Sequence, residues 1–373
     1  MSKKLELYVL DLINGKRKGV VASFFRAILQ FFSWIFRFIV FCRNWAFDHG
    51  WLRRYTPPVP VVISIGNIVA GGTGKTPVTM LLAKEFYDVI PLAILARGYR
   101  AQAEKLSKPV ILSRGNGPLH PPSVCGDEPY MLSQNLPKAF VCVGKDRHEA
   151  SNIAAKAGAK LILLDDGMQH RHLARDFEVV VVDARDPFGH GYFLPRGFLR
   201  EGAKSLARAD LIILNNVHLH DDLTALRQQI AHYTTAPVIG AKPVVEGVFD
   251  LQDKPISSIQ DVKVGLFCGI AHPDYFEKTV QELGAVIVGQ YCIPDHMDFD
   301  PDQLIQFSKE CAAKGAEKLI CTEKDRVKIV EALDLALPIV WVRMHLALVE
   351  GKAQWEDFIQ RVKGNLTRDR QLT

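Results

Sequence analysis

The most informative segment of the sequence is a glycine-rich loop, VAGGTGKT, that follows an apolar run at 61–65 and precedes Pro77. Glycines let backbone N–H groups turn toward a polyphosphate, Lys75 can neutralise its β and γ oxygens, and the Thr76 hydroxyl can bind Mg²⁺. A valine stands first, where the strict motif has glycine, but every phosphate-facing element is retained. The loop predicts an ATP or GTP site formed by Val69, Ala70, Gly71, Gly72, Thr73, Gly74, Lys75 and Thr76.

Carboxylates at the ends of apolar runs are candidates to hold the metal ion. Asp165 and Asp166 directly follow LILL, where the second acidic motif of a nucleotide-binding protein holds Mg²⁺ or its water. Asp183 follows VVVV in the same way, so position alone leaves both alternatives open. Asp127 and Glu128 come just before a proline suited to the first turn of a helix, so they can serve either chemistry or the helix terminus.

Three further groups have both a chemical and a structural interpretation. A lone histidine such as His296 is more often structural than catalytic, and the adjacent Asp295 does not by itself orient its ring. Arg200 and Glu201, within PRGFLRE, can grip phosphate or metal, or can be solvated at the surface. TEKD at 322–325 can form part of an adenine pocket or the capped start of a helix.

Short, continuous apolar runs must position these residues. They lie at 61–65, 92–96, 140–143, 161–164, 179–182 and 211–214, and again at 264–268, 285–288, 318–321 and 339–342. Such runs, separated by amphipathic stretches, predict strands buried on both faces of a parallel sheet. We therefore expect an α/β fold, with a P-loop NTPase-type domain at 55–245, a smaller α/β domain at 246–373 and a linker near 240–260.

The remaining segment, 1–54, is basic and aromatic. Residues 20–42 hold 18 apolar residues, seven of them Phe, and five polar residues spaced by three or four. This spacing places the polar residues on one helical stripe opposite a wide aromatic face, as in a helix that lies in a membrane interface. A full span is disfavoured by Arg26 and Arg37, because a central arginine costs roughly 2.5–3.5 kcal/mol on insertion. A helix buried against the body is the alternative.

The composition excludes several classes of protein. A chain of 373 residues with 48% hydrophobic and 23% charged residues has globular proportions and room for two domains. Ten basic and three acidic residues fall within 1–54, a local charge of +7, so the formal net charge of +5 leaves −2 for the rest. A near-neutral body argues against a nucleic-acid binder. Seven cysteines without a CxxC pair predict free thiols in a reducing compartment.

Six motifs together resemble the tetraacyldisaccharide 4′-kinase family, the lipid A 4′-kinases. They are GGTGKTP (71–77), ARGY (96–99), GDEP (126–129), DDGMQHRHL (165–173), DARDPFGHGYFLPRGFLRE (183–201) and TEKDRVK (322–328). The resemblance implies transfer of the ATP γ-phosphoryl group to the 4′-hydroxyl of a tetraacylated disaccharide 1-phosphate. It also implies a peripheral or monotopic protein at the cytoplasmic face of a Gram-negative inner membrane.

The resemblance further implies roles for individual residues. Asp127 would be the general base for the hydroxyl, assisted by His296, and Lys75 would bind phosphate. Met168 stands where an aromatic residue is common in the family, and we expect it to be a packing residue. The metal shell would comprise Thr76, Asp165, Asp166 and Glu201, and support for the substrate or active site would come from Arg97, Gln169, His170 and Arg200.

Two other classes of function compete with this kinase hypothesis. A membrane-recruited P-loop switch or partitioning ATPase would carry an extra lysine where Ala70 stands, or a dimer interface. A non-enzymatic scaffold has no use for the adjacent Lys75 and Thr76 or for acidic strand ends. The kinase hypothesis expects ATP, an acylated disaccharide lipid and an anionic membrane surface as partners, and no nucleic acid.

Overall fold

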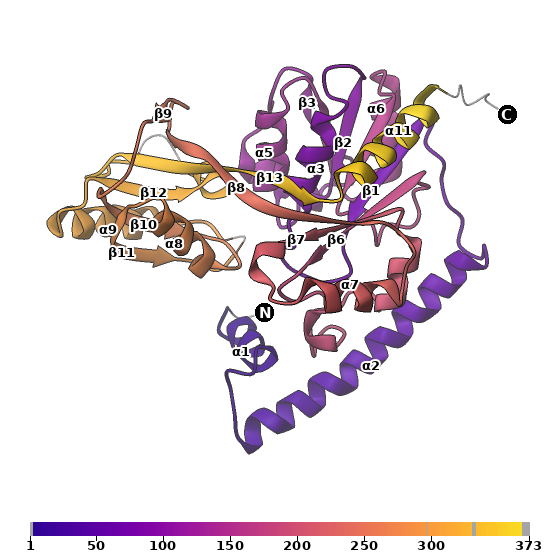
Figure 1. Cartoon of the computed structure of the whole chain (residues 1–373), viewed down its shortest axis with the longest axis horizontal. Helices are drawn as coiled ribbons and strands as arrows, with labels where there is room; N and C mark the ends of the chain where they lie inside the picture. The colour runs from indigo at the N-terminus through magenta and orange to yellow at the C-terminus, as the bar shows by residue number, and fades with distance from the viewer. Residues whose placement is uncertain (1–2, 296, 330–332, 368–373) are drawn as a thin grey trace. The chain divides into compact units, whose positions relative to one another are not determined.

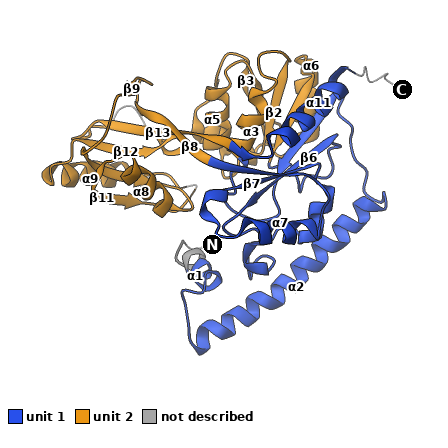
Figure 2. Ribbon diagram, in the orientation of Figure 1, with its two compact units in different colours: residues 1–75, 166–242, 348–373 blue, residues 76–165, 243–347 orange. Residues whose placement is uncertain are grey.

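The computed structural model describes residues 3–295, 297–329 and 333–367 of the chain. The fold is mixed α/β with a large, mostly parallel sheet (Figure 1). The chain divides into two compact units, each assembled from separate stretches of sequence (Figure 2). Unit 1 comprises Met1–Lys75, Asp166–Lys242 and Leu348–Thr373, and unit 2 comprises Thr76–Asp165 and Pro243–Ala347.

Unit 1 contains a parallel group of strands in the order β8-β7-β6-β1. Every residue of β1, β6 and β7 is buried, as expected for strands covered on both faces. The strands are β1 (Val61–Gly66), β6 (Phe177–Asp183), β7 (Leu211–Asn215) and the first part of β8 (Val238–Asp250). The helices are α1 (Lys3–Ile13), α2 (Val20–Asp48), α7 (Leu223–Ala231) and α11 (Lys352–Thr367), with 3₁₀ turns η2 (Gly189–Gly191), η3 (Ala203–Arg208) and η4 (Val217–Leu219).

Unit 2 contains a second group of strands, in the order β5-β2-β4-β3, of which only β3 runs antiparallel to its neighbour. The apolar-run pattern missed β3, because its sequence VILSR is short and ends in polar residues. The strands are β2 (Leu92–Ala96), β3 (Val110–Arg114), β4 (Phe140–Val143) and β5 (Leu161–Asp165). The helices are α3 (Lys75–Lys84), α4 (Pro122–Cys125), α5 (Asp127–Asn135) and α6 (Arg147–Lys156), with η1 (Gln102–Lys105).

The later half of unit 2 forms a third group, in the order β11-β10-β12-β13, with parallel pairing throughout. All ten predicted apolar runs therefore form strands, which confirms the α/β prediction. The strands are β9 (Pro255–Ile256), β10 (Lys263–Cys268), β11 (Val286–Cys292), β12 (Lys318–Thr322) and β13 (Ile339–Glu350). The helices are α8 (Pro273–Glu282), α9 (Pro301–Ala313) and α10 (Glu323–Arg326).

The stretch near 240–260, predicted as a linker, contains the boundary between the compact units at 242/243 but is not irregular. This stretch is occupied by the long strand β8 and by β9, which pairs antiparallel with it. Most of β8 beyond residue 241 is only half-buried, so its sequence lacks the continuous apolar run that marks the other strands. The predicted domains at 55–245 and 246–373 stay a prediction, because each compact unit combines separate stretches of the chain, although one boundary between the units falls at 242/243.

Helix α2 confirms the predicted N-terminal helix and extends it to Asp48. By length and composition it could cross a membrane, with a mean hydropathy of 1.6 in its apolar window and 11% of that window buried. Ser33, on the polar stripe, is buried and donates a 2.9 Å hydrogen bond to the Phe193 carbonyl. The Arg37 guanidinium lies 5.9 Å from the Phe193 ring centroid. The polar stripe therefore contacts the rest of unit 1 at these two residues, whereas Ser23 is exposed.

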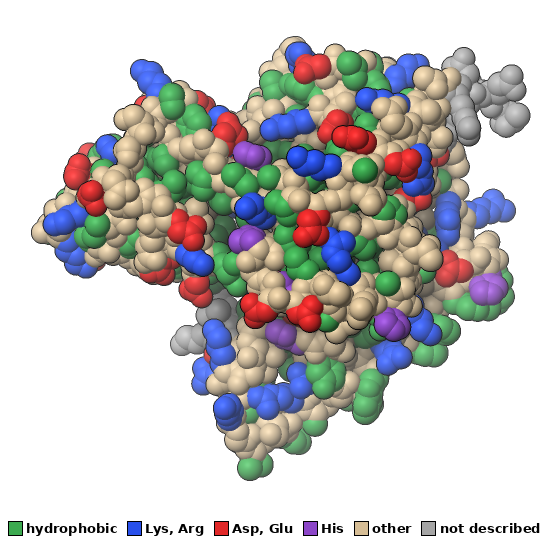
Figure 3. All heavy atoms as spheres, in the orientation of Figure 1, with side chains coloured by type: hydrophobic (Ala, Val, Ile, Leu, Met, Phe, Trp, Pro, Cys, Tyr) green, Lys and Arg blue, Asp and Glu red, His purple; other side chains and the backbone are tan. Residues whose placement is uncertain are grey.

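The opposite face of α2 is apolar and exposed. The exposed aromatic side chains of the helix include Phe24, Phe31, Trp34, Phe38 and Phe41, each more than half exposed. Figure 3 shows hydrophobic side chains gathered along this helix. The alternative of a helix buried against the body therefore does not hold for the aromatic face.

Candidate active site

The glycine-rich loop connects β1 to α3. Its conformation needs glycine at Gly71 and Gly74, whose φ angles are 115° and 92°. A Cβ on Gly74 would lie 2.3 Å from the side-chain nitrogen of Asn215, which donates a 3.0 Å hydrogen bond to the Thr73 carbonyl. The Asn67 side chain donates a 2.8 Å hydrogen bond to the Thr73 hydroxyl. Side chains after β1 and at the end of β7 therefore fix the loop.

Asp166 binds two positively charged side chains near this loop. Its Oδ1 lies 3.5 Å from Lys75 Nζ, and its two oxygens accept hydrogen bonds of 2.9 and 3.0 Å from Arg200 Nη1. Asp166 has a φ of 53°, and this left-handed conformation turns the chain directly after β5. Two cations are thereby held in one place, where they can neutralise phosphate oxygens.

Asp165, the last residue of β5, is buried against α3. Its Oδ1 accepts a 3.0 Å hydrogen bond from the Thr79 hydroxyl, one helical turn after the buried Thr76. Its backbone carbonyl accepts a 3.1 Å hydrogen bond from Arg147, which is also buried. A buried carboxylate beside the first turn of this helix is the arrangement that a second acidic motif requires.

The alternative carboxylate, Asp183, has different partners. Arg185 Nε lies 2.9 and 3.1 Å from its two oxygens, and Asn216 donates a 3.1 Å hydrogen bond to Oδ2. Both oxygens of the Asp183 carboxylate are therefore already bound, by residues that follow β6 and β7. Asp166 is likewise engaged, by Arg200 and Lys75, so the assignment of the pair after β5 as the acidic residues of the site stays a prediction.

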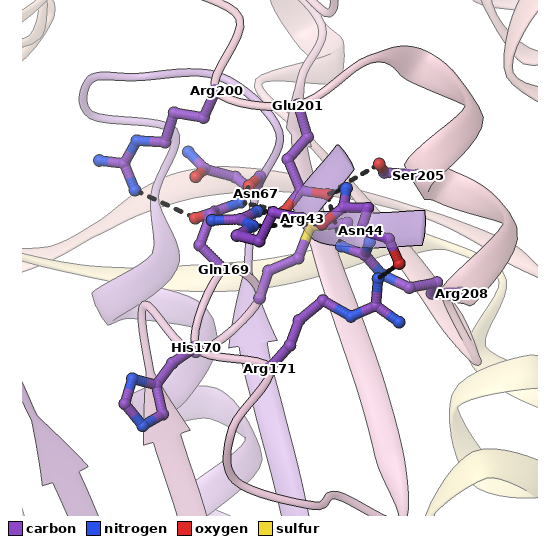
Figure 4. A network of polar contacts seen from close by, with 12 residues as sticks. Arg43, Asn44, Asn67, Gln169, His170, Arg171, Arg200, Glu201, Ser205 and Arg208 are labelled. Carbon is purple, nitrogen blue, oxygen red and sulfur yellow. Dashed lines mark hydrogen bonds and ion pairs between the residues drawn. The ribbon is translucent and has the colours of Figure 1, made fainter. Parts of the chain in front are cut away.

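Glu201 is fully buried at the centre of a polar network that holds the end of α2 (Figure 4). Asn44 and Ser205 each donate a 2.8 Å hydrogen bond to Oε2, and Arg208 pairs with the same oxygen at 2.9 Å. Arg43 pairs with Oε1 at 3.4 Å. Burial alone would raise the pKa of Glu201, but Arg208 and the hydrogen bonds from Ser205 and Asn44 outweigh burial and hold the pKa below its ordinary value.

Replacing Glu201 with glutamine is expected to lower the free energy of unfolding by about 3–5 kcal/mol at neutral pH, because Arg43 and Arg208 lose their shared anion. The pKa of Glu201 is lower in the folded state, so its stabilisation is complete above the ordinary value of 4.5 and is lost as pH falls through the folded value. Urea unfolding of both proteins, from neutral to acidic pH, measures this difference. A difference that stays constant below pH 4.5 would contradict it.

Gln169 connects the Glu201 network to the glycine-rich loop. Its Nε2 donates to the Asn67 carbonyl at 2.8 Å and to Glu201 Oε1 at 3.2 Å, while its Oε1 accepts from Arg200 at 3.4 Å. His170, its neighbour in sequence, points its ring away from Glu201 (Figure 4). Of these two predicted support residues, only Gln169 joins the network around Glu201.

In unit 2, Asp127 is the first residue of α5 and lies beside a buried lysine. Its Oδ2 is 3.5 Å from Lys328 Nζ, and the two side chains are 16% and 3% exposed. Asp127 and Glu128 both lie in the first turn of α5, where acidic side chains complement the helix dipole, so the helix-terminus role considered for them stands beside the chemical one. Arg97 is half-exposed and pairs with Glu104 at 2.9 Å. His296, the predicted assistant of Asp127, lies outside the described residues.

The TEKD segment forms the capped start of α10, one of its two predicted roles. The Thr322 hydroxyl accepts a 3.1 Å hydrogen bond from the backbone N–H of Asp325. Lys324 bridges two carboxylates, Glu128 at 3.1 Å and Asp295 at 2.9 Å. Burial would lower the pKa of Lys324, but the charges of these two residues raise it well above its ordinary value. A role of TEKD in an adenine pocket stays a prediction.

Comparison with known proteins agrees with the motifs. A family model described as LpxK, tetraacyldisaccharide-1-P 4′-kinase, matches residues 25–363. The chain belongs to the tetraacyldisaccharide-1-phosphate 4′-kinase family. It is 31% identical over 344 residues to the tetraacyldisaccharide 4′-kinase of Halothermothrix orenii, covering 88% of this chain and 89% of that one. It is 34% identical over 323 residues to that of Chlamydia pneumoniae, covering 85% of each.

The fold also resembles that of a solved member of the kinase family. That solved structure is the "apo" form of LpxK from Aquifex aeolicus in complex with ATP. The present chain is 27% identical to it in sequence, and the two structures superimpose with a TM-score of 0.72. The match covers 91% of this chain and 99% of that one. The likeness therefore extends over both compact units of the present kinase-family chain.

Several side chains of this kinase-family site were missed from the sequence. Asn215 follows the run LIIL as Asp165 follows LILL, so its position at a strand end was a usable signal. Lys328 lies within the quoted motif TEKDRVK, but only the fold brings it to Asp127. Arg43 and Asn44 carried no signal, because their partner Glu201 lies about 160 positions away in the chain. Met168 is fully buried in an apolar cluster, which confirms its predicted packing role.

Proposed function

We propose that this chain transfers the γ-phosphoryl group of ATP to the 4′-hydroxyl of a tetraacyldisaccharide 1-phosphate, in lipid A biosynthesis. The proposal is supported above all by the fixed glycine-rich loop with Lys75 and Arg200 held together on Asp166, in a member of this kinase family. We also infer a P-loop NTPase-type architecture for the strands that carry this loop. Phosphoryl transfer depends mainly on positioning and on neutralising charge, and the loop with its two cations supplies both.

We further infer that Asp127 accepts the proton of the attacking hydroxyl. A sugar hydroxyl is a very weak acid, so a carboxylate can take its proton only as the bond to phosphorus forms. Asp127 suits this role because it is partly exposed and pairs with a cation that stabilises its charged form. Arg97, Gln169, His170, Arg200 and His296 stay predicted as support for the substrate or the active site.

The donor atoms near the loop fit Mg²⁺, the metal that the kinase family implies. The Thr76 hydroxyl and the carboxylates of Asp165 and Asp166 are the oxygen ligands that this ion prefers. Among the residues that the structure describes, no group of three or more His, Cys, Asp or Glu could hold a metal by itself, so phosphates and water would complete the shell. When bound, Mg²⁺ neutralises charge on the β and γ oxygens. Glu201 fits less well, since nitrogen and hydroxyl donors surround its carboxylate.

We propose that α2 attaches the protein to the cytoplasmic face of the inner membrane. Large apolar side chains of α2 are exposed from Val20 to Trp45, while Ser33 of its polar stripe is bonded to the rest of unit 1. The basic residues Lys16, Arg17 and Lys18 precede it and are exposed, so they can meet anionic head groups. An acylated substrate would be found at this same surface.

A turnover assay tests the proposed reaction. Incubation with γ-labelled ATP and detergent-dispersed tetraacyldisaccharide 1-phosphate is expected to place the label on the lipid, and Lys75→Ala serves as the inactive control. Label released only as inorganic phosphate would contradict the kinase proposal and support a nucleotide-driven switch. A strong preference for GTP over ATP would also contradict it.

A further inference from the structure

Lys328 is a buried cation whose three N–H donors have three acceptors around them. Its Nζ lies 3.2 Å from the Met297 carbonyl, 3.3 Å from Asp325 Oδ1 and 3.5 Å from Asp127 Oδ2. Its side chain is 3% exposed, and its Nζ also lies 5.9 Å from the Phe299 ring centroid. A lysine in this position is fixed in place, because burial without these acceptors would be strongly unfavourable.

The acceptors of Lys328 differ in how they are held. Asp325 is fully buried, and its Oδ2 accepts a 2.6 Å hydrogen bond from the Thr322 hydroxyl. Asp325 therefore serves as a fixed counter-charge that anchors the lysine. Asp127 is the more exposed of the two carboxylates bound by Lys328, at 16% against 0%. Of this ion-pair group, Asp127 is the member that can reach a substrate.

We propose that Lys328 is a positioning residue for phosphoryl transfer, which orients the Asp127 carboxylate and keeps it ionised. This inference rests on the proposed role of Asp127 as general base. The charged groups nearby are the anion Asp325 on α10 and the anion Glu128 on α5, and Glu128 is neutralised by its own partner, Lys324. Lys328 is a cation that faces Asp127, and the same Nζ donates a hydrogen bond to the Met297 carbonyl, which ties it to the backbone.

The decisive experiment is a double-mutant cycle with steady-state kinetics. Lys328→Gln removes the charge but retains hydrogen-bond donors for Met297 and Asp325. It is expected to lower kcat by about 10–10²-fold with an unchanged KM for ATP, because the base is displaced rather than the nucleotide. The acid limb of the pH profile of kcat should move up by about one unit, since the carboxylate loses a nearby positive charge. Lys328→Arg keeps the charge and should retain more activity than Lys328→Gln.

The Asp127→Asn background separates positioning from stability. There, Lys328→Gln should cause little further loss of kcat, because the group it acts on is gone. Arg326→Gln is the matched control: it removes another cation of the same segment, which pairs with Asp253 at 2.8 Å. It should affect thermal stability without moving the acid limb. If Lys328→Gln does not fold, Lys328→Arg is placed in the same cycle.

Two results would overturn the inference. Losses of kcat from Lys328→Gln and Asp127→Asn that multiply independently would show a purely structural role for the lysine. An acid limb that stays in place in Lys328→Gln would show that the lysine does not act on the titrating base. If Asp127→Asn itself keeps wild-type kcat, the base assignment of the proposed function fails instead, which this design reports separately.

Discussion

Replacing Asp127 with alanine is expected to lower kcat by about 10²–10⁴-fold while the affinity for ATP changes little, the usual scale for losing a general base. The carboxylate is partly exposed at the first turn of α5, in unit 2, whereas the side chains that hold Lys75 belong to unit 1. The loss should therefore fall on the chemical step. Steady-state kinetics with both substrates varied, together with direct ATP binding, measures the two effects.

Glu128→Gln is the matched control for this prediction. Glu128 is the next residue of the chain, is also acidic, and pairs with Lys324 in the way that Asp127 pairs with Lys328. Its substitution should leave kcat within several-fold of the wild type, because its carboxylate has no proposed contact with the acceptor. An Asp127→Ala protein with near wild-type kcat would remove Asp127 from the role of base.

Removing the exposed aromatic side chains of α2 is expected to abolish tight membrane association. Phe31, Trp34, Phe38 and Phe41 are 57–66% exposed, and burying each such side chain in lipid contributes about 1.5–3 kcal/mol. Replacing all four with serine should lower partitioning to vesicles by at least about 10⁴-fold. Vesicle flotation with anionic lipids, at low and high salt, measures the change.

The control for this prediction replaces exposed apolar residues elsewhere. Val89 and Leu119 are 72% and 54% exposed and lie in unit 2, so serine at these positions should leave vesicle binding unchanged. Deleting residues 1–42 should have the same effect as the fourfold α2 variant. Tight binding of the truncated protein to vesicles at high salt would show that the body makes the attachment.

The strands were predictable because a strand that is buried on both faces has a continuous run of apolar residues. LAILA at 92–96 and FVCV at 140–143 coincide with β2 and β4 to the residue. The second half of β8 escaped detection because its half-buried residues produce no such run, so the sequence predicted a linker there without a strand. Local sequence therefore reveals a strand when both of its faces are covered, and reveals much less when they are not.

The site was predictable where function demands particular residue types in a row. The glycine-rich loop and the two aspartates after β5 are of this kind. The partners that fix them are not, because Asn215 and Lys328 act through contacts between distant parts of the chain. The sequence predicts the polar stripe of α2. It does not predict which face of the helix packs on the protein, because that contact is made with the distant residue Phe193.

The Glu201 network has a mechanical consequence. Within unit 1, hydrogen bonds and ion pairs lead without a gap from Asn44 near the end of α2 to Glu201, Gln169, Arg200, Asp166 and finally Lys75. If α2 rests in the lipid surface, this rigid path sets the height of Lys75 above the bilayer. The enzyme would then act on hydroxyl groups held at one fixed depth in the membrane surface. A sugar anchored in the bilayer by its acyl chains would have its hydroxyl at that depth, next to the phosphate. A freely dissolved sugar would not be positioned in this way.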